Sequence, residues 1–222
     1  MSDTTANPLE TPVARAAQER AERLKAEATP LDSASLDLLF REARSHNGWQ
    51  ERPVSDALLK ELYEIIRWGS TSMNCCPARF VFVRSKTGKE RLLSALAPAN
   101  IDKVLAAPVT VIIAYDLKFH SYMPQLFPHR DVTPIFENDP EFTQTTAFRN
   151  GTLQGAYLML AARSMGLDCG PISGFDNDTL DTEFFANTSI KSNFLCSLGY
   201  GDTQKVFQRL PRLDFSTACE LT

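Results

Sequence analysis

Residues 109–115 constrain the fold most strongly, because they read Val-Thr-Val-Ile-Ile-Ala-Tyr and are almost entirely apolar. A strand that is apolar on both sides of its pleat is typical of the centre of a sheet with both faces covered. Two further runs, at residues 80–83 and 194–201, have the β-branched and aromatic content of strands. The sequence therefore predicts a sheet whose central strand is buried on both faces.

Helical patterns flank these strands, with apolar side chains recurring at helical spacing. Helices are expected at residues 33–46, 55–69, 90–96, 101–105, 145–165 and 178–185. Ser55 is the predicted N-cap of the second helix and Gly69 its stop. Residues 169–176 are expected to form a tight loop. Residues 116–143, where aromatics mix with Pro and His, are expected to form a lid or a substrate wall.

Length and composition exclude several classes of protein. The chain has 222 residues, 43% of them hydrophobic and 23% charged, which suits a globular domain with its own core. The net charge of −4 gives no support for a nucleic-acid partner or a membrane surface. No apolar run approaches the roughly 20 residues that span a bilayer, and no secretory signal opens the chain. We therefore expect a cytoplasmic protein without membrane or nucleic-acid partners.

The first thirty residues differ in composition from the rest. Residues 1–30 are rich in Ala, Glu and Arg, and residues 13–28 favour a charged helix with little apolar face. They are predicted to form an N-terminal extension, either a solvated helix or an arm lying on a partner subunit. Residues 31–222 are predicted to form the functional domain.

The cysteines and histidines do not predict a disulfide framework or a metal site. Five cysteines are an odd number, which in a cytoplasmic chain argues against structural disulfides. The adjacent Cys75 and Cys76 are either a redox dithiol or two small residues packed beside a ligand pocket. The three histidines lack the spacing of a zinc site, so no metal is expected.

Residues 69–83 carry the clearest functional signal, because a helix stop is followed by a polar loop and then by a strand. The loop reads Ser-Thr-Ser-Met-Asn-Cys-Cys-Pro, so it can offer backbone N–H groups and short hydrogen-bonding side chains to a planar polar ligand. The segment resembles the flavin-contacting motif of the FMN-dependent nitroreductase family, (P/S)-(S/T)-S-x-N-x-x-P-x-x-F. Four other segments resemble the same family in the same order, and together they extend over residues 33–222.

The resemblance implies an α+β, nitroreductase-like fold, with a mixed, mostly antiparallel sheet flanked by helices. It further implies an intertwined homodimer that binds FMN in pockets built from both subunits, with terminal arms around the partner. NADPH or NADH would bind only transiently, since no G-x-G-x-x-G occurs in the chain.

The resemblance also assigns cofactor-binding residues. The FMN phosphate and ribityl chain are expected to contact Arg44, Ser45, His46, Arg209 and Arg212. The flavin ring is expected to contact Ser70, Thr71, Ser72, Asn74, Asn100, Lys103, Ile172, Ser173 and Gly174. The first segment departs from the family by having Asn and Gly in place of further basic residues. Ser173 stands where many members carry an acidic residue, which weakens any role for a carboxylate in positioning nicotinamide.

Several strings resemble one branch of the family in particular, namely those at residues 44–49, 74–79, 126–129, 146–150 and 200–202. That branch contains the malonic semialdehyde reductase of uracil degradation. It implies NADPH-linked reduction of malonic semialdehyde to 3-hydroxypropionate in pyrimidine degradation, by ping-pong hydride transfer through flavin N5.

An anionic substrate needs a cation near the flavin. Arg149 is the first candidate and Arg79 or Arg130 the next, because arginine binds carboxylates bidentately. Arg149 could equally form an ion pair between subunits. The proton could come from His129, from water or from a donor at the flavin edge.

Three alternatives stay open at the level of sequence. The first is a broad nitro- or quinone reductase with the same FMN. The second is a flavin-binding protein without turnover, and the third is a structural domain without a cofactor.

Overall fold

The computed structural model describes residues 8–222, which divide into two compact units that meet at the Arg41–Glu42 bond. The expectation about a secretory signal depends on the first residues, and residues 1–7 lie outside the described part. The division into residues 1–30 and 31–222 stays a prediction. No helix in the described part is long and apolar enough to cross a membrane. Nor do residues 8–222 contain a cluster of His, Cys, Asp and Glu suited to a metal ion.

The N-terminal unit is helical. It contains a 3₁₀ turn at Pro8–Glu10, α1 at Pro12–Glu27, α2 at Ser33–Leu36 and a π-helix at Asp37–Arg41. The Thr11 side chain caps α1 by accepting a hydrogen bond from the Ala14 N–H group (3.1 Å). No residue of α1 is buried within the single chain, and whether the extension is a solvated helix or an arm on a partner subunit stays a prediction.

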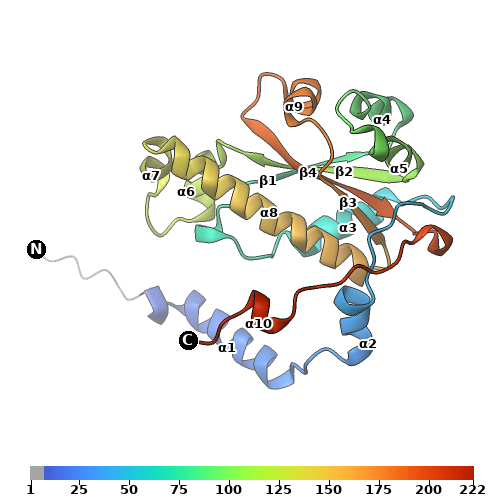
Figure 1. The fold of residues 1–222 in the computed structure, drawn as a ribbon. Coiled ribbons are helices and arrows are strands. Elements are labelled where there is room, and N and C mark those ends of the chain that lie inside the picture. The colour runs from blue at the N-terminus through green and yellow to red at the C-terminus, as the bar shows by residue number, and fades with distance from the viewer. Residues whose placement is uncertain (1–7) are drawn as a thin grey trace, which may run out of the picture. The chain divides into compact units, whose positions relative to one another are not determined.

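A four-stranded sheet organises the unit from Glu42 to Thr222 (Figure 1). The strands are β1 (Ala78–Val83), β2 (Val109–Asp116), β3 (Asp168–Ile172) and β4 (Ile190–Gly199). They lie in the order β1-β2-β4-β3, and every neighbouring pair is antiparallel. All of β2 is buried, which confirms the prediction of a central strand covered on both faces.

Helices cover both faces of this sheet. Helices α3 (Asp56–Ile66) and α8 (Pro140–Ser164) share one core cluster with Val109, Val111 and Ile113. Helices α4 (Lys86–Leu92), α5 (Ile101–Ala106) and α9 (Asn177–Phe185) share the other cluster with Ile112 and Ala114. Alternate side chains of β2 therefore enter opposite cores, as the strand period of two requires.

The remaining elements are short. They are α6 (Met123–Leu126), α7 (Thr133–Glu137), α10 (Phe215–Ala218) and 3₁₀ turns at Ser72–Asn74, Pro98–Asn100, Phe119–Tyr122 and Thr203–Lys205. The segment expected to be a lid buries Phe119, Met123 and Phe136 in a third cluster. The predicted Ser55 cap is present, because its Oγ accepts a hydrogen bond from the Leu58 N–H group (3.2 Å).

Two expectations about secondary structure are wrong. Residues 169–172 belong to β3 and are not a loop. The strand lies at the edge of the sheet, where Pro171 is tolerated because its missing N–H breaks no central ladder. The helix expected over residues 33–46 ends at Leu36 and is followed by a π-helix. Further along, Ser45 forms an isolated parallel bridge with Cys169 of β3 and therefore cannot continue a helix.

Candidate functional site

The first candidate segment runs along the outer edge of β3. The His46 N–H group donates a hydrogen bond to the Cys169 carbonyl oxygen (2.9 Å). The His46 side chain is buried, and its Nε2 lies 3.3 Å from Oδ1 of Asp168. Burial alone would raise the pKa of Asp168, but the hydrogen bonds from His46 and from the Gly201 N–H group lower it below its ordinary value. His46 is thus part of a fixed turn beside the sheet.

Two arginines connect this segment to the C-terminal tail. Arg44 donates a hydrogen bond to the Phe207 carbonyl oxygen. Arg209 lies 3.5 Å from the Ala43 carbonyl oxygen and 3.5 Å from Glu42 Oε2. Both guanidinium groups keep further N–H donors that could bind an anion. Within residues 8–222, Arg212 donates hydrogen bonds only to the carbonyl oxygens of Leu210 and Pro211, so it does not connect the two segments.

Asn100, Lys103 and Gly174 form a second group. Asn100 Nδ2 donates to the Gly174 carbonyl oxygen (2.9 Å), and Lys103 Nζ donates to Asn100 Oδ1 (3.4 Å). A Cβ atom on Gly174 would lie 2.5 Å from Asn100 Nδ2, so only glycine allows this close approach. Ile172, at the end of β3, is buried, whereas Ser173 is exposed. The loop after β3 thus presents polar groups at the surface.

Trp49 connects the first two groups, although the sequence analysis gave it no role. Its indole N–H donates to the Lys103 carbonyl oxygen (3.3 Å). Its ring also lies beside Gly170 of β3 and Gly199 of β4, where any Cβ would approach it within about 3 Å (3.2 and 3.0 Å). Trp49 therefore fixes the helix that carries Lys103 against the sheet.

The third group is the loop between α3 and β1. Ser70 and Ser72 are exposed, and Thr71 is half-buried. The Thr71 hydroxyl accepts a hydrogen bond from the Cys76 N–H group (3.2 Å), which closes the loop on itself. Asn74 Nδ2 donates to the Leu126 carbonyl oxygen (2.9 Å). Asn74 thereby joins this loop to the segment that carries His129.

Helix α8 holds the same loop through side chains that the sequence analysis did not single out. Asn150 accepts a hydrogen bond from the Ser72 N–H group (2.8 Å), and Gln154 accepts one from the Ala78 N–H group (2.9 Å). Tyr157 donates its hydroxyl to the Ser70 carbonyl oxygen (2.9 Å). Polar residues spaced by four and three positions on an otherwise apolar helix face are the sequence signal that could have identified them.

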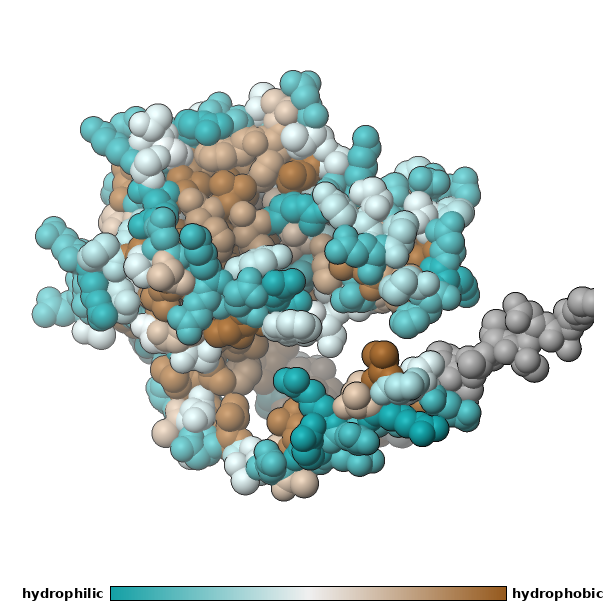
Figure 2. Space-filling view, turned by 180° about the vertical axis from the view of Figure 1, so that it is seen from behind, coloured by the Kyte–Doolittle hydropathy of each residue, from teal (hydrophilic) through white to brown (hydrophobic). Residues whose placement is uncertain are grey.

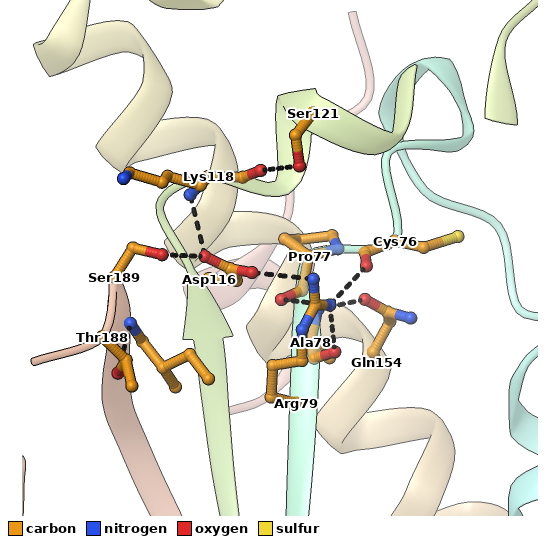
Figure 3. Close-up of polar contacts among 11 residues, drawn as sticks. Cys76, Pro77, Ala78, Arg79, Asp116, Lys118, Ser121, Gln154, Thr188 and Ser189 are labelled. Carbon is orange, nitrogen blue, oxygen red and sulfur yellow. Dashed lines mark hydrogen bonds and ion pairs between the residues drawn. The ribbon is translucent and has the colours of Figure 1, made fainter. Parts of the chain in front are cut away.

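Arg79 is committed to structural contacts. Figure 3 shows its guanidinium group between Asp116, with an N–O distance of 2.8 Å, and the carbonyl oxygens of residues 76–78. Burial would raise the pKa of Asp116, but hydrogen bonds from the Ser189 hydroxyl, the Lys118 N–H group and Arg79 lower it below its ordinary value. An arginine held in this way is poorly suited to capture a substrate carboxylate.

The two residues proposed for catalysis lie at the surface. Arg149 is exposed on α8, next to Asn150, and has no hydrogen bond or ion pair within residues 8–222. His129 is exposed in the loop after α6 and packs edge-on against Phe127, with 5.5 Å between ring centroids. Both side chains are therefore accessible to a substrate.

The groups lie at opposite edges and faces of the sheet within one chain. The loop that carries Ser70–Asn74 precedes the edge strand β1 and is held by α8. Asn100 and Gly174 lie beside α5 and the other edge strand, β3. Three strand spacings of roughly 4.8 Å separate these edges, about 14 Å in total. No hydrogen bond or ion pair links the two groups in the described part of the chain.

Two surface hollows lie along β1 and do not include the groups around Asn100 or Arg44. One of about 430 Å³ is lined by Tyr63, Cys76, Ala78, Arg79, Phe80, Phe82, Tyr122, Gln125 and Leu126. The other, of about 500 Å³, is lined by Asp56, Leu59, Lys60, Tyr63, Glu64, Phe82 and Arg84. Figure 2, a view from behind relative to Figure 1, shows hydrophobic side chains gathered around a hollow. Such surface is typical of a binding face.

The cysteines have no bonded partners in the structure, where all five are free thiols. Cys75 is buried, and burial together with the neighbouring Cys76 raises the pKa of its thiol to about 12. Cys76 is half-buried at the rim of the smaller hollow. The arrangement agrees with small residues packed beside a pocket.

Comparison with known proteins adds a family and a set of relatives. Residues 40–201 match the model described as "Nitroreductase family". A Cupriavidus pinatubonensis protein is 57% identical over 189 residues, covering 84% of this chain and 96% of its own length. A Ralstonia pickettii protein is 56% identical over 190 residues, covering 84% and 97%. Both have the provisional name NADH dehydrogenase/NAD(P)H nitroreductase.

Solved structures share the fold at low sequence identity. A Bacillus subtilis nitroreductase-type protein superposes with a TM-score of 0.78 at 20% identity, covering 86% of this chain and all of its own (100%). An Exiguobacterium sibiricum protein of the same type, solved in complex with FMN, has a TM-score of 0.74 at 19% identity, covering 88% and 100%. The predicted nitroreductase-like α+β fold is thereby confirmed.

Proposed function

Because the chain belongs to the nitroreductase family, we propose that it is an FMN-dependent NAD(P)H oxidoreductase. The observation that carries the proposal is the hydrogen-bonded group of Lys103, Asn100 and Gly174, which joins a cation and an amide to a glycine with no room for a side chain. A planar polar ring needs donors along its edge and close access to backbone, and this group offers both. The residues present therefore fit FMN.

The remaining residues complete the proposed cofactor site. Arg44 and Arg209 suit a phosphate, because their hydrogen bonds and ion pair within residues 8–222 leave N–H donors of each guanidinium group unused. Ser45 and His46, at the turn beside them, would shape that end of the site. The loop from Ser70 to Asn74 contributes hydroxyl and amide groups, and Lys103 supplies the cation that favours an anionic reduced ring.

The chain's own residues would bind and orient the reactants, while bound FMN supplies hydride transfer between NAD(P)H and the oxidised substrate. His129 is accessible and can deliver a proton to the product oxygen. The cysteines are not needed for this chemistry.

For the physiological substrate we propose malonic semialdehyde, reduced to 3-hydroxypropionate in pyrimidine degradation in the cytoplasm. The support is the resemblance of the strings quoted above to that branch, together with an exposed Arg149 that has no partner within residues 8–222. A free guanidinium group can bind the substrate carboxylate bidentately. Arg79, which is committed to Asp116, is the weaker candidate.

A broad nitro- or quinone reductase with the same cofactor is the second candidate. It is favoured by the names of the two relatives, which refer to NADH dehydrogenase and NAD(P)H nitroreductase. In that case Arg149 would have no role in binding a neutral acceptor.

We further propose that the active form is a homodimer whose sites combine both subunits. The donors of one chain lie at opposite edges of its sheet, so a second copy could bring the Ser70–Asn74 loop to the Asn100 group. Large hydrophobic side chains are exposed on α3 and the turn after it, on α8 and on the C-terminal tail, among them Tyr63, Ile65, Trp68, Phe148, Leu153, Phe207, Leu210 and Leu213. The Trp68 side chain, which is the largest of these, is 81% exposed. Covering such side chains is a common reason for association.

The experiment that tests the substrate is anaerobic and has two steps. The protein is reduced with one equivalent of NADPH and then mixed with malonic semialdehyde, a quinone or a nitroarene while the flavin absorbance is followed. Fast reoxidation by the aldehyde supports the specific reductase. Reoxidation only by the quinone or the nitroarene supports the second candidate.

Mixed dimers test the shared site. One chain carries Asn100→Ala and the other a substitution in the loop, Asn74→Ala. Each homodimer is expected to bind FMN weakly, whereas the mixed dimer regains one intact site of two. If each site is instead built from one chain, each of the two sites in the mixed dimer carries one substitution, so mixing gives no tight site and the two-subunit arrangement is wrong.

A further inference from the structure

The loop before β1 has an unusual backbone. Of the four residues other than glycine with positive φ in the described chain, three lie here: Met73 (50°), Asn74 (53°) and Cys76 (39°). Asn tolerates this region, but Met and Cys do not, and each such residue costs roughly 1–3 kcal/mol. A loop of this kind keeps its shape only if its surroundings impose it.

Helix α8 supplies those constraints through two buried amides. Asn150 is 2% exposed and Gln154 is 6% exposed. Asn150 holds the Ser72 N–H group just before the left-handed residues, and Gln154 holds the Ala78 N–H group just after them. Figure 3 shows Gln154 beside Ala78 and the Arg79 guanidinium group. The strained stretch is thus fixed at both of its ends.

The orientation of the Asn150 amide is itself fixed. Its Nδ2 donates to the Thr146 carbonyl oxygen one turn earlier (2.8 Å), so its Oδ1 must face the loop. A buried amide with both ends satisfied is a rigid acceptor, whereas an unsatisfied one would be costly. Asn150 can therefore impose a position on Ser72.

Two glycines bring α8 close enough for these contacts. A Cβ atom on Gly151 would lie 3.0 Å from Cβ of Tyr115 on β2, and one on Gly155 would lie 2.6 Å from the Phe194 ring on β4. Each glycine is adjacent in sequence to an amide, and both lie against the sheet. The close packing of helix and sheet therefore sets the reach of Asn150 and Gln154.

We infer that Asn150 and Gln154 are positioning residues, which hold the Ser70–Asn74 loop in the one conformation that presents its donors to the isoalloxazine ring. The inference depends on the proposed function for the identity of the ligand. The two amides themselves act through the loop backbone, since their oxygens are occupied by the Ser72 and Ala78 N–H groups.

The first test does not depend on the cofactor. Hydrogen–deuterium exchange is measured on the full-length protein before FMN is added. In Asn150→Ala, the Ser72 amide is expected to exchange about tenfold faster, because its acceptor is lost. Gln144→Ala is the matched control, since Gln144 is an exposed amide on the same helix and makes no hydrogen bond to the loop within residues 8–222. It should leave exchange at Ser72 unchanged.

The second test measures the dissociation constant for FMN and the absorption spectrum of the bound flavin. Asn150→Ala is expected to weaken FMN binding about tenfold and to shift the spectrum, with Gln144→Ala unchanged. Asn150→Asp keeps an acceptor for Ser72, so it should bind FMN more tightly than Asn150→Ala even though a buried carboxylate lowers stability. A purely structural role predicts the reverse order, because Asn150→Asp would be the more damaged protein.

Tyr157→Phe keeps the test decisive if substitutions at Asn150 prevent folding. It removes only the hydroxyl that donates to the Ser70 carbonyl oxygen, and it should weaken FMN binding about threefold. Unchanged Ser72 exchange in Asn150→Ala, or faster exchange with unchanged FMN affinity, overturns the inference. A wild-type protein that binds no FMN overturns the proposed function instead, and the exchange data then still show whether the amides fix the loop.

Discussion

Replacing Gly174 by alanine separates the proposed cofactor site from the stability of the fold. The new Cβ would lie 2.5 Å from Asn100 Nδ2, well inside van der Waals contact. Gly174 does not have a positive φ, so its backbone accepts alanine without strain. The clash must therefore be relieved by movement of the Asn100 side chain.

The size of the effect follows from what Asn100 loses. Swinging away breaks its hydrogen bond to the Gly174 carbonyl oxygen and the contact from Lys103. The Gly174 carbonyl oxygen keeps its bond from the Ala97 N–H group, and water can reach the exposed loop. Stability should fall by about 1 kcal/mol at most, or roughly 2–4 °C in Tm. FMN affinity should fall by about tenfold, since the ring-binding amide and cation are both displaced.

Gly166→Ala is the matched control. Gly166 has a φ of +79° and nothing within 4 Å of its Cβ position, so alanine there brings strain without a clash. It should cost about 1 kcal/mol through the left-handed backbone and leave FMN affinity unchanged. The two variants should therefore lose similar stability, whereas only Gly174→Ala should lose FMN affinity.

Thermal unfolding without FMN and titration with FMN measure the two quantities. Wild-type FMN affinity in Gly174→Ala would contradict a role for Asn100 and Lys103 in binding the ring. A loss of affinity in both variants, in proportion to their loss of stability, would contradict it as well.

Three further predictions concern other parts of the chain. The pKa of Asp116 is lower in the folded protein than in the unfolded chain. Its ionised carboxylate therefore stabilises the fold above its unfolded pKa of roughly 4, and this stabilisation is lost as the pH falls toward the folded pKa. Asp116→Asn should therefore reduce the decrease in the urea midpoint of unfolding between about pH 5 and 3. Arg149→Ala should raise the KM for malonic semialdehyde by at least about tenfold and leave the KM for a neutral quinone unchanged, as one lost charged hydrogen-bonding partner requires; equal effects on both would contradict a carboxylate-binding role. Cys219 is exposed, whereas Cys75 is buried with its pKa raised to about 12; a thiol reagent at pH 8 should therefore label the first rapidly and the second only after unfolding, as peptide mass spectrometry can show.

Strong local patterns predicted the fold well. The apolar run of β2 identified the centre of the sheet, and Ser55 identified the start of α3, because burial on both faces and N-capping leave direct marks on sequence. The edge strand β3 was missed, since Gly170 and Pro171 resemble loop residues. Pro171 is tolerated because β3 lies at the edge of the sheet, and Gly170 is needed because the His46 backbone lies against it. Neither the edge position nor the contact with His46 can be predicted from the residues next to Gly170 and Pro171 in the sequence.

The candidate site was predictable as a set of residues and less so as an arrangement. Motif order suggested both the Ser70–Asn74 loop and the Asn100 group, but only the sheet topology reveals that they lie at opposite edges of one chain. Asn150 and Gln154 were missed for a similar reason. Their importance comes from the backbone conformation of a distant loop, since their hydrogen bonds to it join residues 78 and 76 positions apart along the chain.

The most direct test of the account is the flavin content of the purified protein and its response to NADPH without oxygen. The account predicts a yellow protein that binds about one FMN per chain and whose flavin absorbance is bleached by one equivalent of NADPH or NADH. A protein that stays colourless after incubation with FMN, or that holds FMN which neither nucleotide bleaches, would contradict it.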